Sequence, residues 1–273
     1  MNQKRKPYKL SKNWRGVCYI ISILLLIIAG VCAGILIEDF QGKHSDQMAF
    51  EEIADTLYAE NESESEIRIP DNMDEIDPDW EVLAAYRKLA KENPDMIGWI
   101  QIEGTTVNYP VMYTPDQPSF YLKRNFYKEY SDLGTPFLQE TCDPDDSNNL
   151  ILYGHHMIAG GMFSDLDLYK EEAFWKESQV IHFDTLKETA EFEVFSVIVV
   201  DLYSPRWFRF YEYTDMDEEA FVQYVEMCRN RSIYDTGVIP DYGDQLLTLV
   251  TCEYSSNNGR LIVVAKEINK EGN

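Results

Sequence analysis

The chain has 273 residues, and about 190 of them remain for one globular domain once an N-terminal apolar segment and a polar stretch are set aside. The first 37 residues carry six basic residues and no acid, so residues 38–273 hold 18 basic against 48 acidic residues, a net charge of −30. Residues 38–273 are so acidic that they lack a basic patch to neutralise phosphates, which excludes nucleic acid as a partner.

The first predicted element is a membrane segment at residues 17–37, which contains no charged side chain. Twenty-one helical residues are enough to cross a hydrocarbon core of about 30 Å. Basic residues precede the segment and Glu38 and Asp39 follow it, so residues 1–16 are predicted to be cytoplasmic and the rest extracellular. A cleaved signal peptide is the alternative, because Val31-Cys32-Ala33 loosely resembles a cleavage site.

The next segment, residues 38–78, is rich in acids and serine and poor in large apolar residues. This composition is typical of a stalk or a loosely helical linker. The predicted domain occupies residues 79–273 and begins with an amphipathic helix from Trp80, which Asn93-Pro94 ends.

Short runs rich in β-branched and aromatic residues follow, separated by turn residues, and predict about eight strands. Many strands with few long helices indicate a mainly β fold, either a barrel or a sandwich. Two stretches have helical periodicity instead, 163–175 and 217–229, and we expect both to lie against the strands. Cys228, in the second stretch, is interpreted as a structural thiol.

A polar motif follows the strand NLILYG, where His155 and His156 precede the glycines Gly160 and Gly161. A histidine at the end of a strand can exchange protons with a thiol and an amine, the role that a cysteine acyl-transferase requires. The adjacent pair does not itself decide which histidine acts.

A second motif lies in the C-terminal run QLLTLVTCEYSSNNGRLIVVAK, in which a predicted strand ends at Cys252 and the next begins at Arg260. If the two strands pair as a hairpin, the thiol and the guanidinium face each other. A nearby cation favours the thiolate, and a guanidinium suits a developing oxyanion.

Together these motifs resemble the class B sortases of Gram-positive bacteria, and the runs NPDMIGWIQIEGTTVNYPVMY and FYLKRNFYKEYSDLGTPFLQ are similar to the N-terminal half of that class. The resemblance covers residues 80–268. It implies a closed eight-stranded sortase-type β-barrel with an N-terminal helix and a helix in the connection before the cysteine strand. It assigns catalytic roles to His155, Cys252 and Arg260, with His156 structural.

The same resemblance implies three substrate contacts: Leu122, Thr251 and Glu253. The turn between Cys252 and Arg260 is shorter than in some relatives, so the details of the groove and the substrate motif stay open.

The activity that the resemblance implies is transpeptidation. Cys252 attacks after Thr in an LPxTG- or NPxTN-like C-terminal sorting motif of an exported protein, and the acyl group passes to a cell-wall peptidoglycan amine. Pilin polymerisation, plain proteolysis and a non-catalytic scaffold role are the alternatives. No cofactor is expected and no metal-ligand spacing is present. A disulfide between Cys142 and Cys228 stays open.

Overall fold

The computed structural model describes residues 12–63, 80–158, 160–204, 209–253 and 258–268. The chain divides into two compact units, Met1–Ser45 and Asp46–Asn273. The long helix α1 runs over Lys12–Ser63. Within the first unit its apolar side chains are exposed, and among the described residues this is the one helix long and apolar enough to cross a membrane.

The second unit is built on a closed barrel with the strand order β1-β2-β3-β4-β7-β8-β6-β5. The strands are β1 (Met96–Gln101), β2 (Asn108–Met112), β3 (Phe137–Leu138), β4 (Asn149–Tyr153), β5 (Val180–Thr185), β6 (Glu191–Asp201), β7 (Leu246–Glu253) and β8 (Gly259–Glu267). Each strand coincides with one of the predicted β-rich runs. The prediction of a closed eight-stranded barrel is therefore confirmed.

Strands β4 and β7 are parallel neighbours, with Asn149 beside Leu246 and Tyr153 beside Val250. A parallel pair requires a long crossover, and the chain between them supplies η3 (Ser164–Lys170), α3 (Glu172–Glu177), β5, β6, η4 (Phe210–Glu212) and α4 (Glu218–Arg231). The predicted helical stretch at 163–175 is thus two short helices, and the one at 217–229 is α4. This topology brings the two predicted motifs to adjacent strands.

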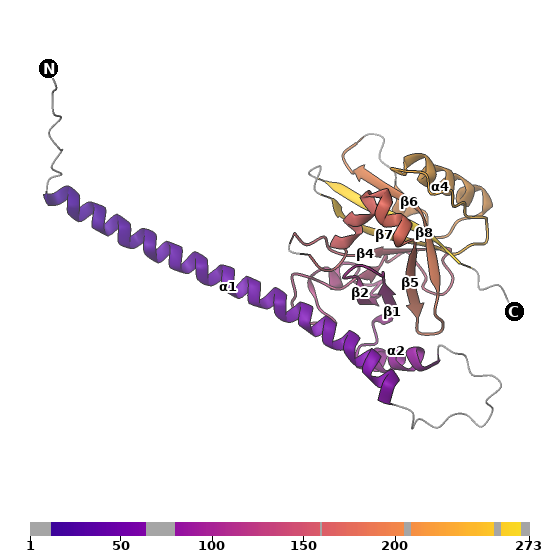
Figure 1. Cartoon of the computed structure of the whole chain (residues 1–273), viewed down its shortest axis with the longest axis horizontal. Helices are drawn as coiled ribbons and strands as arrows, with labels where there is room; N and C mark the ends of the chain where they lie inside the picture. Colours follow the sequence, from indigo (N-terminus) through magenta and orange to yellow (C-terminus); the bar gives the residue numbers. More distant parts are fainter. Residues whose placement is uncertain (1–11, 64–79, 159, 205–208, 254–257, 269–273) are drawn as a thin grey trace, which may run out of the picture. The chain divides into compact units, whose positions relative to one another are not determined.

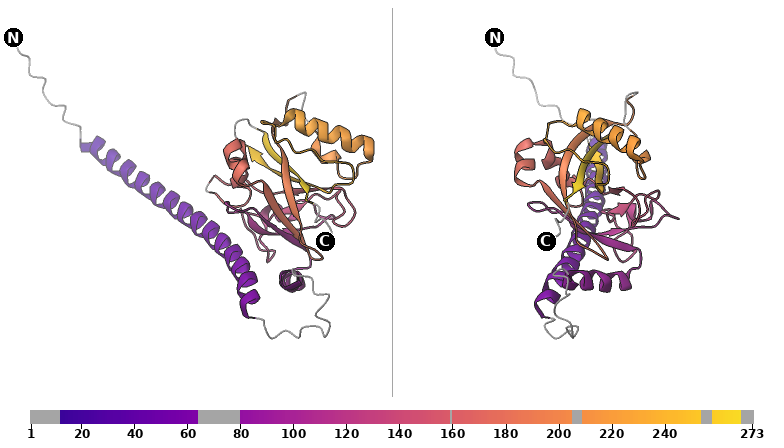
Figure 2. Two further views of the ribbon diagram at one scale, coloured as in Figure 1. Left: turned by 45° about the vertical axis from the view of Figure 1, so that its right-hand side comes forward. Right: turned by 90° about the vertical axis from the view of Figure 1, so that its right-hand side faces the viewer.

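Two helices cover the barrel at opposite ends, as Figures 1 and 2 show. Helix α2 (Trp80–Glu92) packs on β1, where Tyr86 stacks on Trp99 with ring centroids 5.9 Å apart. Helix α4 lies beside β6, where Ser196 donates a hydrogen bond of 2.8 Å to the Cys228 carbonyl. Asp217 caps α4 by accepting from the Ala220 amide at 2.9 Å, a preferred N-cap arrangement.

The C-terminal part of α1 contributes four buried apolar side chains to the core, at the spacing of one helical face: Phe50, Ile53, Ala54 and Leu57. They lie in the segment predicted to be an acidic stalk, residues 38–78. Acids at 51, 52 and 55 lie between these apolar residues along the chain, although not on the same face of the helix, and they give the segment the composition of a linker. The boundaries of the predicted segments stay a prediction.

Candidate active site

The β7–β8 hairpin places Cys252 directly opposite Arg260, one pair before the strands end. Directly opposed residues of an antiparallel pair project to the same face, with Cβ atoms about 5 Å apart. Both side chains are half-buried, and Nη1 of Arg260 donates to the carbonyl of Gly259 at 2.8 Å. The thiol therefore lies within the field of a permanent cation.

The β4–β7 register brings the histidine motif to the same edge of the barrel. The Gly154 amide donates to the Val250 carbonyl at 3.1 Å, and the Thr251 hydroxyl donates to the Gly154 carbonyl at 2.8 Å. His155 therefore leaves β4 beside the end of the strand that carries Cys252.

The imidazole of His155 is oriented by one contact, in which Nε2 lies 2.7 Å from the Leu122 carbonyl oxygen. Because a carbonyl only accepts, Nε2 carries the proton and Nδ1 of the neutral ring is left as the acceptor. Burial lowers the pKa of His155 below its usual value, while the bond to Leu122 opposes that change. At neutral pH the ring is therefore mainly a base.

His156 has a different environment, with only 12% of its side chain exposed. Its Nε2 lies 3.2 Å from Oδ2 of Asp167 in η3. The ring therefore ties the loop after β4, described over residues 155–158 and 160–163 and called the histidine loop, to the next helical segment, which fits the predicted structural role.

The three predicted substrate contacts differ in how the structure presents them. Leu122, in η2 (Phe120–Lys123), is 40% exposed and its carbonyl meets His155. Thr251 is buried, and its hydroxyl is occupied by the Gly154 carbonyl. Glu253 is the last residue of β7, and its side chain lies outside the described part of the chain.

Gly154 has a role that the sequence reasoning did not identify. A Cβ at this position would lie 2.5 Å from the ring of Phe163, so glycine alone lets that ring close over the start of the histidine loop. The YGHH run contains the glycine, but its contact with Phe163 depends on the loop's return path.

Tyr153 is a second residue that the sequence reasoning missed. It pairs with Val250, so it lies on the face of the sheet that carries Cys252 and Arg260. Its hydroxyl donates to Oε1 of Gln139 at 2.7 Å, and its ring lies 5.7 Å from that of Phe137. Two aromatic rings therefore lie on the sheet face that carries the thiol.

The other two cysteines of the second unit are poor nucleophiles. Cys142 and Cys228 are free thiols, so the structure holds no disulfide between them, and both are buried. Burial raises the pKa of Cys142 to about 12 and raises that of Cys228 further. Within this unit, Cys252 alone is half-exposed.

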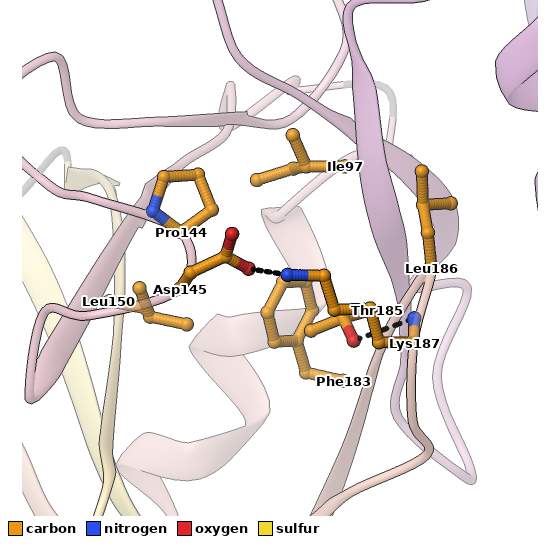
Figure 3. Close-up of a pocket in the computed structure, with 8 residues that line it drawn as sticks. All are labelled: Ile97, Pro144, Asp145, Leu150, Phe183, Thr185, Leu186 and Lys187. Atoms are coloured by element: carbon orange, nitrogen blue, oxygen red, sulfur yellow. Dashed lines mark hydrogen bonds and ion pairs between the residues drawn. The ribbon is translucent and has the colours of Figure 1, made fainter.

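A cavity of about 230 Å³ lies away from this edge, near the first residues of β4 rather than the last (Figure 3). Its lining is mostly apolar, with an ion pair of 2.6 Å between Lys187 and Asp145 across it. Among the described residues, no cluster of His, Cys, Asp or Glu is arranged to hold a metal ion.

Known proteins are similar to this chain in both sequence and fold. The Sortase domain family matches residues 100–268. A sortase B of Staphylococcus aureus is 32% identical over 187 residues, which cover 67% of this chain and 74% of the relative. A sortase B of Listeria monocytogenes is 30% identical over 195 residues, 70% and 76% of the two chains. The crystal structure of a sortase B complexed with triglycine is 26% identical, with a TM-score of 0.69, and the match covers 82% of this chain and 98% of that one.

Proposed function

This chain belongs to the sortase family and is a cysteine transpeptidase of the class B kind, and we propose that Cys252 is its nucleophile, His155 its acid and base, and Arg260 its oxyanion-side cation. One observation carries this proposal. The registers of β4, β7 and β8 bring a half-buried thiol, a guanidinium and an imidazole to one edge of the barrel.

In the first half-reaction the Cys252 thiolate attacks the carbonyl carbon of the substrate's threonine. The Arg260 guanidinium stabilises the charge on the carbonyl oxygen as the tetrahedral intermediate forms. The carbon–nitrogen bond then breaks, the His155 imidazolium gives its proton to the leaving amine, and a thioester remains on Cys252.

In the second half-reaction an incoming amine attacks the thioester. Neutral His155 takes the proton from that amine, the carbon–sulfur bond breaks, and Cys252 leaves as the thiolate. Because the pKa of His155 is lowered by burial, the imidazolium form needed for the first half-reaction is a minor species at neutral pH. Only the fraction of the enzyme whose His155 is protonated can therefore give a proton to the leaving amine at any moment.

The substrates are exported proteins with an LPxTG- or NPxTN-like sorting motif, cleaved after threonine, and the acceptor is a peptidoglycan amine. Two features support this assignment. The related sortase B was solved with triglycine, a peptide with a free amine, and Leu122, whose carbonyl contacts His155, has an exposed side chain that an extended peptide can pack on.

Residues 17–37 anchor the protein in the membrane as a single span, with residues 1–16 in the cytoplasm and the domain outside. The exposed apolar face of α1 and the six basic residues before it support this topology. Membership of a family related to the cell surface also supports it.

The test uses the full chain in detergent, incubated with LPxTG, NPxTN and SPxTG peptides with and without triglycine, and read by mass spectrometry. We expect cleavage after threonine, a triglycine adduct of the acyl fragment, and a thioester on Cys252. Cys252→Ala and His155→Ala should each abolish both products. Cleavage that continues in either variant would refute the assigned residue, and hydrolysis without an adduct would identify a peptidase.

A further inference from the structure

We infer that Tyr109 is a positioning residue for His155, and that Gln47 and Phe50 of α1 hold Tyr109 in place. The inference rests on the proposed role of His155. It concerns the histidine loop, which the structure describes over residues 155–158 and 160–163.

The histidine loop returns on itself, so that its two ends are bonded together. The Phe163 amide donates to the His155 carbonyl at 2.9 Å. Ser164 closes the middle, because its hydroxyl accepts from the Met157 amide at 2.7 Å and has one proton to donate, with the Gly161 carbonyl at 2.7 Å and the Met157 carbonyl at 2.9 Å as its two acceptors. These bonds link the end of the loop that carries Phe163 to His155, so a restraint at that end also restrains His155.

The far end of the loop has a backbone that needs support. Met162 has φ of 51°, in the left-handed region that a side chain other than glycine rarely adopts. Its side chain is fully buried, and its amide donates to the Tyr109 hydroxyl at 3.1 Å. Strained backbone persists where its surroundings determine it, and Tyr109 supplies the hydrogen bond at this point.

Tyr109 is itself held from the other side by α1. Its buried ring meets the Phe50 ring edge-on, with centroids 5.5 Å apart, and its hydroxyl lies 3.5 Å from the Gln47 amide oxygen. Burial raises the pKa of Tyr109, so the hydroxyl stays protonated and can donate to Gln47 while it accepts from Met162.

Gln47 also reaches the histidine loop directly. Gly161 has φ of 89°, and a Cβ there would lie 3.0 Å from Oε1 of Gln47. The helical segment 46–63 is therefore part of the support for the acid/base residue as well as a spacer.

The decisive variant is Tyr109→Phe in the full chain, because it keeps the ring and removes only the hydroxyl. We expect kcat for triglycine transfer to fall about tenfold, in line with the loss of one hydrogen bond in the catalytic support, while KM is unchanged. A looser loop exposes His155 to water, which raises its lowered pKa. The acid limb of kcat/KM should therefore move to higher pH.

Tyr113→Phe is the matched control, since that hydroxyl donates to the Cys142 carbonyl at 2.6 Å, away from the histidine loop. It should leave kcat and the pH profile unchanged. Gln47→Ala should give a smaller change in the same direction as Tyr109→Phe, and it tests the inference if Tyr109→Phe does not fold. Near-UV circular dichroism checks folding.

The outcomes separate the two proposals. If His155→Ala is inactive but the kcat and acid limb of Tyr109→Phe match those of the unmodified protein, the positioning role is wrong and the catalytic assignment stands. If His155→Ala remains active, the catalytic assignment is wrong and this inference fails with it.

Discussion

The two ends of the β7–β8 hairpin differ in burial and in polarity. At its base, Leu247 and Leu249 face Ala265 and Val263, and all four are fully buried. At its mouth, about 10 Å further along the same strands, Cys252 and Arg260 are half-buried. The buried pairs at the base fix the register that places Cys252 opposite Arg260 at the mouth.

The polar residues of the base show the same division. Thr248 is buried, and its hydroxyl is bonded to Asn149 of β4 at 2.8 Å and to Tyr224 of α4 at 3.0 Å. These polar groups are thus paired within the protein. At the mouth, the Cys252 thiol and the Arg260 guanidinium remain accessible to a substrate.

The largest expected effect is that of removing the Cys252 thiol, which should change activity without changing stability. Cys252→Ala should reduce transpeptidation at least about a thousandfold, because the acyl-enzyme cannot form, while the thermal midpoint stays the same. Product formation and a thermal melt measure the two quantities. Cys228→Ala is the matched control, with activity retained and a lower midpoint, because that thiol belongs to the buried side of α4.

Truncating the base should have the reverse effect. Leu249→Ala opens a cavity in the barrel interior and should lower the free energy of unfolding by about 2–5 kcal/mol. Denaturant unfolding measures this loss. The folded protein should keep its kcat at low temperature, since the strand register is set by many pairs. A large fall in kcat without a loss of stability would show that base and mouth are not separate.

Two substitutions of Arg260 separate the contribution of its positive charge from that of its planar set of donors. Arg260→Ala should lower kcat/KM about a hundredfold, the usual cost of one oxyanion donor. Arg260→Lys keeps the charge but loses the planar set of donors, so it should recover only part of that loss. Steady-state kinetics with a fixed peptide measures both variants. Full recovery by lysine would show that charge alone is used.

The smallest expected effect comes from two charges around His155. Lys123 lowers the pKa of His155 and Asp132 raises it, and the two side chains pair at 2.7 Å. Lys123→Gln should therefore move the acid limb of kcat/KM to higher pH, and Asp132→Asn should move it to lower pH. Both shifts should shrink at high salt, because these side chains are partly exposed. Shifts in the same direction would contradict an electrostatic origin.

Local sequence patterns predicted the strands well, because runs of β-branched residues between turn residues form β4, β6, β7 and β8. The Cys252–Arg260 pairing also follows from a short hairpin. The prediction that His155 lies near Cys252 depended on the resemblance to known sortases, because local sequence does not reveal that β4 and β7 pair in parallel.

The support under the histidine loop could not be predicted. Tyr109 and Gln47 are 62 residues apart, and their contact depends on a helix whose acidic residues give it the composition of a linker. The left-handed backbone at Met162 is equally hidden, because methionine carries no signal for it.

The place of β7 in the barrel has a consequence for the order in which the domain folds. Strand β7 lies between β4 and β8, and its Thr251 bonds to Gly154, 97 residues earlier in the chain. Contacts of such long sequence separation close late, because the intervening chain must first lose its entropy. Under the proposed catalytic assignment, Cys252 therefore lies beside His155 only after the C-terminal strands have paired and the barrel has closed, and the enzyme is inactive until then.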